Sequence, residues 1–75
     1  MPRAGQCLHT IERIENANAS AARARLRLTQ LEVLLRNLAQ RGAISDYNIT
    51  IAVADIAEVR TVLQSLQDEL TTFRG

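Results

Sequence analysis

Cys7, His9 and Glu12, near the start of the chain, are residues of types that could do chemistry. On a helix Cys7 and His9 lie about 200° apart, so one chain cannot bring them together as a thiolate–imidazole pair. His9 and Glu12 share a face, but metal sites in helical bundles use the order Glu-x-x-His with further carboxylates, which this segment lacks. We therefore expect no catalytic residue, no metal and no cofactor, and no enzymatic activity.

Three arginines, Arg23, Arg25 and Arg27, could bind nucleic acid. Arg23 and Arg27 share a helix face, whereas Arg25 points nearly the other way. No aromatic residue is interleaved with them for base stacking, and the net charge of the chain is only +1. The pattern favours a solvated helix flank over a nucleic-acid site.

The composition indicates one small domain, residues 1–75, that needs help to fold stably. Chains of this length are near the lower limit for a self-sufficient core, and a single cysteine allows no internal disulfide. Another protein or a second copy of the chain is therefore the expected source of stability. The sequence has no apolar run of about 18 residues and no signal-peptide pattern. These observations predict a cytoplasmic protein with no membrane span and no small-molecule substrate.

Alanine, leucine and other helix formers fill the chain, and its few helix breakers divide it into two helices. We expect helices at about 6–41 and 46–73, joined by a turn at 42–45, as an all-α antiparallel hairpin. Gly42 can adopt the left-handed conformation that ends a helix, and Ser45 or Asp46 can cap the next one. Residues 47–53 also alternate with the period of a strand, but the helical pattern that continues to Phe73 favours a helix.

Both helices carry apolar residues at heptad spacing, which predicts a seam of a and d positions along which they pack. In the first helix the a positions are Cys7, Ile14, Ala21, Leu28 and Leu35, and the d positions are Thr10, Ala17, Ala24, Leu31 and Leu38. In the second the a positions are Ile49, Ile56, Leu63 and Leu70, and the d positions are Ala52, Val59, Leu66 and Phe73. Asparagine and serine at 16–20 could break the first helix, although we favour a continuous one.

Further apolar residues of the first helix lie outside the seam and predict a second packing surface. Some occupy f positions opposite the seam, and others widen the apolar surface or lie where the longer first helix overhangs the second. A hairpin alone cannot cover them. The predicted partner-binding residues are Leu8, Ile11, Ala19, Leu26, Val33 and Leu34.

Several short motifs give residues 21–70 a resemblance to a known family. They are Arg25-Leu26, Leu38-Ala39-Gln40-Arg41-Gly42, Asp46-Tyr47, Ala57-Glu58 and Leu63-x-x-Leu66. With these motifs the chain resembles the YscE-like co-chaperones of type III secretion needle subunits, which are small bacterial helical hairpins. The resemblance implies a cytoplasmic protein that packs one hairpin face against a helical-repeat chaperone. Together the two would keep the needle subunit soluble and unpolymerised.

Two classes of function remain open at this point. The first is a non-enzymatic protein–protein interaction module, such as that co-chaperone, whose hairpin a partner protein completes. The second is a self-dimerising four-helix bundle that regulates or inhibits a host protein, for example a phage-encoded one. A nucleic-acid binder that uses the arginine flank is the least favoured alternative.

Overall fold

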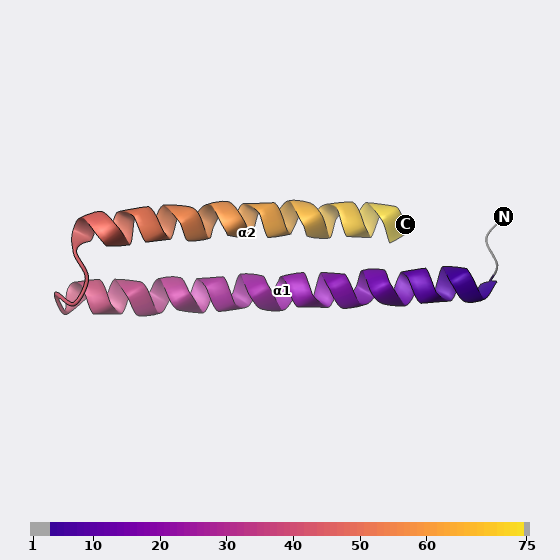
Figure 1. Cartoon of the computed structure of the whole chain (residues 1–75), viewed down its shortest axis with the longest axis horizontal. Coiled ribbons are helices and arrows are strands. Elements are labelled where there is room, and N and C mark those ends of the chain that lie inside the picture. Colours follow the sequence, from indigo (N-terminus) through magenta and orange to yellow (C-terminus); the bar gives the residue numbers. More distant parts are fainter. Residues whose placement is uncertain (1–3, 75) are drawn as a thin grey trace.

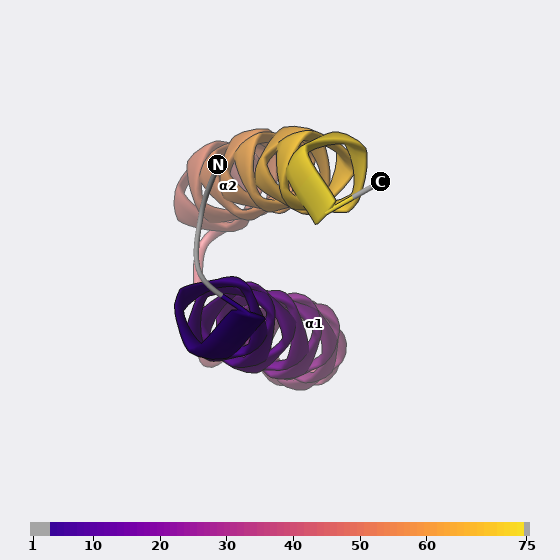
Figure 2. The ribbon, with the colours of Figure 1, turned by 90° about the vertical axis from the view of Figure 1, so that its right-hand side faces the viewer.

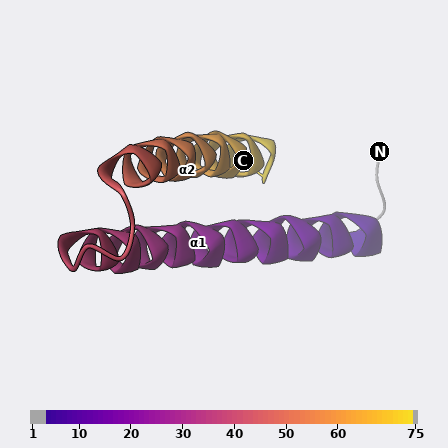
Figure 3. The same cartoon turned by 60° about the vertical axis from the view of Figure 1, so that its left-hand side comes forward.

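The protein is an antiparallel hairpin of two long helices (Figure 1). The computed structural model describes the backbone of residues 4–74 and the side chains of residues 10–73. Helix α1 spans Ala4–Gln40 and helix α2 spans Asp46–Arg74, with no strand among the described residues. The all-α fold class predicted from the sequence is confirmed, and the helix bounds lie close to the expected ones. The α1 end near the N-terminus projects beyond the C-terminal end of α2 (Figures 1 and 3).

Helix α1 runs without interruption through the polar segment at 16–20. Asparagine and serine weaken helices when their side chains compete for the helix's own backbone groups. Here the Asn18 side chain instead accepts a hydrogen bond from Gln67 Nε2 of α2, with Oδ1 at 2.9 Å. The Ser20 hydroxyl accepts one from Arg23 Nη2 at 3.1 Å. The oxygen atoms of Asn18 and Ser20 thus have side-chain partners, and the favoured continuous helix is confirmed.

The turn between the helices is built from two caps. Gly42 has φ 77°, and the amides of Gly42 and Ala43 donate to the carbonyls of Ala39 and Leu38 at 3.0 and 2.9 Å. This pair of bonds is the Schellman motif, which satisfies the last carbonyls of α1. At the start of α2, Ser45 Oγ accepts from the Asn48 amide at 3.2 Å, so Ser45 and not Asp46 is the N-cap.

The hairpin is thin and has little interior. Its Cα atoms extend over 59 × 14 × 12 Å, and seen end-on the two helices lie side by side with no other described element against them (Figure 2). The buried apolar residues are Ile14, Ala21 and Ile56. Within the part of the chain that the structure describes, neither helix combines the length and the apolar character needed to cross a lipid bilayer. Apart from Ile14, Ala21 and Ile56, the apolar side chains that the structure describes are exposed or half-buried.

Replacing Gly42 tests the turn. We expect Gly42→Ala to lower the free energy of unfolding by about 1 kcal/mol, because a side chain disfavours the left-handed conformation. The cost is conformational, since a Cβ at this position would meet no atom within 4 Å. Gly42→Asn is the matched control, because asparagine tolerates this conformation better and should cost less. Urea unfolding followed by circular dichroism measures both, and equal losses would contradict the assignment.

Candidate interaction surface

The two helices face each other with their a and e positions. On the a row Ile14, Ala21 and Ile56 are buried, and the remaining described leucine and isoleucine residues of that row are half-buried. The e positions beside them are half-buried over most of the contact, and they are mainly polar. These half-buried e residues are Asn18, Arg25, Glu32, Ala39, Val53, Arg60 and Gln67. The contact inside the hairpin is therefore centred between a and e on each helix.

Polar side chains of the e row bridge the helices along one side of the hairpin. Arg25 Nη1 donates to Gln67 Oε1 at 2.7 Å, and Gln67 Nε2 in turn donates to Asn18. Nearer the turn, Arg60 Nη1 lies 3.5 Å from Glu32 Oε1. We call this side, defined by these five residues, the polar side. Its hydrogen bonds fix how the helices are rotated about their own axes.

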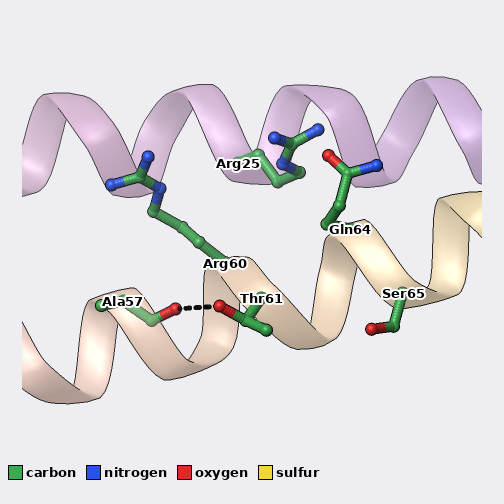
Figure 4. A pocket seen from close by; sticks show the side chains of 6 residues that line it. All are labelled: Arg25, Ala57, Arg60, Thr61, Gln64 and Ser65. Atoms are coloured by element: carbon green, nitrogen blue, oxygen red, sulfur yellow. Dashed lines mark hydrogen bonds between the residues drawn. The ribbon is translucent and has the colours of Figure 1, made fainter.

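A shallow depression on the polar side holds two guanidinium groups, those of Arg25 and Arg60 (Figure 4). Gln64 and Ser65 of α2 also line it, and the hydroxyl of Thr61 there donates to a carbonyl of its own helix. Both guanidinium groups already bind side chains of the facing helix. The depression is therefore part of the contact between the helices, and its cations are engaged in holding the hairpin together.

The d positions, by contrast, are largely exposed. Leu31 and Leu38 are 43% and 41% exposed, and Leu66 and Phe73 are 41% and 73% exposed. The prediction that the d row is buried in the seam is therefore wrong for its large side chains. On a helix d lies about 60° to one side of a and e about 40° to the other, so a contact centred between a and e turns d outward.

The exposed d residues of both helices lie on the same side of the hairpin. In an antiparallel pair, equivalent flanks of the two helices come together, as the bonds between e positions show. The d flanks must then meet on the opposite side, where the neighbouring g positions add Leu34 and Val62. We call this strip the open face. It consists of Leu31, Leu34, Leu38, Val59, Val62, Leu66 and Phe73, each at least 41% exposed.

The partner-binding residues predicted from the sequence do not form one surface. The side chain of Leu8 lies outside the described part, and Ile11 is 36% exposed. Leu34 lies on the open face. Leu26 and Val33 are also exposed, but their f positions lie about 100° or more around α1 from the open face. Ala19 shares that f row and is exposed.

Sequence reasoning missed the six other residues of the open face. It assigned five of them, which lie on the d row, to the seam, and it did not single out Val62 at its g position. A signal for them was present in the e row. Asn18, Arg25 and Glu32 on one helix, and Arg60 and Gln67 on the other, can pair with one another across an antiparallel contact. Such pairing indicates that e, and not d, flanks the contact inside the hairpin.

The arginine cluster is divided by the fold. Arg25 is half-buried in the contact between the helices, whereas Arg23 and Arg27 are exposed at c and g positions of α1, beside the open face. Among the residues that the structure describes, no three histidine, cysteine or acidic side chains are grouped so that they could hold a metal ion. The open face holds seven of the twelve large apolar side chains that are exposed on the described part of the chain, and it is therefore the candidate interaction surface.

Comparison of the chain with protein-family models, with curated proteins and with solved structures gives no match.

Two leucines of α2 test the rotation of the helices. We expect Leu63→Ala, at a half-buried a position, to lower the free energy of unfolding by about 2 kcal/mol, because it leaves a cavity between the helices. Leu66→Ala removes the same atoms from the exposed d row and should cost about 1 kcal/mol or less. Urea unfolding at the lowest workable protein concentration compares them. Equal losses there would mean that both rows face the other helix.

Proposed function

We propose that this chain is a non-enzymatic protein–protein interaction module whose open face packs against helices of another polypeptide. The observation that carries the proposal is the open face itself: seven large apolar side chains in one strip that spans both helices. Single exposed apolar residues are common on protein surfaces, but many on one side of a small molecule indicate an interaction surface.

The shape and chemistry of the open face suit a helical partner. On each helix its residues recur at i, i+3 and i+7. Residues at this spacing line one side of a helix and contact another helix that packs along it. The hairpin has few apolar residues in its interior, so covering the strip would also stabilise the fold. Binding and folding are therefore expected to be coupled.

A more specific form of this function is the cytoplasmic co-chaperone role that the resemblance to YscE-like proteins implies. In that role a helical-repeat chaperone would cover one face of the hairpin, and the pair would hold a needle subunit. The support for it is the set of short motifs in residues 21–70. It predicts a partner of a mass different from that of the chain.

Site-directed photo-crosslinking tests the proposed function in the cells that naturally make the protein. A benzoylphenylalanine in place of Leu34 should give a covalent adduct with a polypeptide, because this side chain lies on the open face. The same group in place of Ala22, an exposed b position on the far side of α1, is the control and should give little adduct. Adducts of equal yield at both positions, or none at Leu34, would refute the proposal. The mass of the adduct distinguishes a chaperone from a second 8.3 kDa chain.

A further inference from the structure

We propose that a second copy of this chain covers the open face, with α1 of each copy packed against α2 of the other. The result is a four-helix bundle whose two-fold axis runs parallel to the helices. This inference rests on the proposed function, because it names the polypeptide that the open face binds.

Each helix is rotated about its own axis as in a four-helix bundle, and not as in an isolated two-helix hairpin. In a four-helix bundle each helix has two neighbours, at roughly right angles around its axis, and its a and d residues point to the centre. Here each helix turns its a–e side to its hairpin partner. The d–g side lies about 100° further round, where the second neighbour of a bundle would be. A second hairpin with the same helix spacing fills both vacant positions at once.

The hairpin exposes more surface than a compact protein of the same mass. The accessible surface of the hairpin is 5917 Å², whereas a compact monomer of 8.3 kDa exposes about 4,600 Å². Part of the excess of about 1,300 Å² comes from the elongated shape. Standard protein interfaces bury about 800 Å² on each partner. Burial of the open face can therefore bring the chain close to the surface area of an ordinary folded protein.

The charges that flank the open face are divided by helix. Among the described charged residues at c and g positions, those of α1 are all arginine and those of α2 are all acidic. They are Arg13, Arg23 and Arg27 on α1, and Asp55, Glu58 and Glu69 on α2, each of them exposed. The two edges of the open face therefore carry opposite charges, so the face is complementary to a second copy of itself.

This division selects one of the two symmetric ways to stack two hairpins. A two-fold axis perpendicular to the helices would place α1 on α1 of the second copy, so that arginines face arginines and acids face acids. An axis parallel to the helices places α1 on α2 of the second copy, so that arginines face acids. Like charges in close apposition are unfavourable, and complementary charges fix the orientation of partners.

The positions of the charged residues along the helices also agree with the parallel axis. Rotation about such an axis keeps equivalent residues of the two copies at the same level along the bundle. Inside the hairpin, Arg25 and Asn18 both reach Gln67. Because the helices are antiparallel, a step of two residues back on α1 reaches the same level as a step of two residues forward on α2. Arg23 therefore lies level with Glu69 of the second copy, just as Arg25 lies level with Gln67. In the same way, a step of nine residues forward on α1 matches nine back on α2, so Arg27 bears the relation to Glu58 of the second copy that Asn18 bears to Gln67. The arrangement therefore forms each of these pairs twice.

Charge exchange tests the arrangement by sedimentation equilibrium of the full chain. Wild type should form dimers of twice 8.3 kDa at micromolar concentration. Arg23→Glu with Arg27→Glu, and separately Glu58→Arg with Glu69→Arg, should each weaken self-association at least about tenfold, because four attractive pairs become repulsive. An equimolar mixture of the two variants should regain wild-type association, since each α1–α2 contact is then complementary. Ala22→Glu with Thr29→Glu, on the opposite side of α1, is the control and should associate as wild type does.

The outcomes separate this inference from the proposed function. If a variant alone loses its helical signal and the mixture restores it, the inference is supported, because dimerisation and folding are coupled in so small a chain. Variants that associate as wild type does would overturn the parallel axis. A wild-type chain that stays monomeric at about 100 µM, yet crosslinks through position 34 to a polypeptide of another mass, would overturn the second copy and leave the proposed function standing. If the wild-type chain neither dimerises nor crosslinks through position 34, both the second-copy inference and the proposed function are refuted.

Discussion

The rotation of each helix about its own axis is the constraint on which the rest of this structure depends. Polar e residues, above all Gln67 with Arg25 and Asn18, bridge the helices and hold the a–e sides together. If the same helices turned their a–d sides inward, the leucines of the d row would be covered and the polar residues would face water. In the observed rotation, polar side chains of the e row take part in the contact between the helices, and the large side chains of the d row stay exposed to another polypeptide.

Energetically this is an unusual choice for an isolated pair of helices. A hydrogen-bonded pair of polar side chains contributes about 0.5–1.5 kcal/mol to stability, whereas each leucine fully removed from water contributes about 1.5–3 kcal/mol. A chain that leaves Leu31, Leu38 and Leu66 at the surface gives up a large part of the stabilisation available to it. The choice becomes favourable when a second layer of helices covers those residues, because the a row and the d row then form one core.

The two apolar regions of α1 have different positions in such an assembly. The open face, with Leu34 at its g edge, would be interior. Leu26 and Val33 lie about 100° or more around the helix and would remain on the outside of the bundle. The f row is therefore available to a further protein even when the open face is occupied, which is compatible with an adaptor role.

The sequence by itself determined the two helices, their bounds within a few residues, and the turn, because these depend on local chemistry. Helix propensity, the glycine at 42 and the serine cap at 45 act over a few residues and are visible in the chain. The sequence also determined that apolar residues exceed what one hairpin can bury. It did not determine which heptad row flanks the other helix. Composition favoured the apolar d row, but a, d and e lie within about 100° of one another, so a modest rotation of each helix exchanges d for e. Only the tertiary structure decided that, through side-chain pairs between residues far apart in sequence. Gln67 meets Arg25 at a sequence separation of 42, and Arg60 meets Glu32 at a separation of 28.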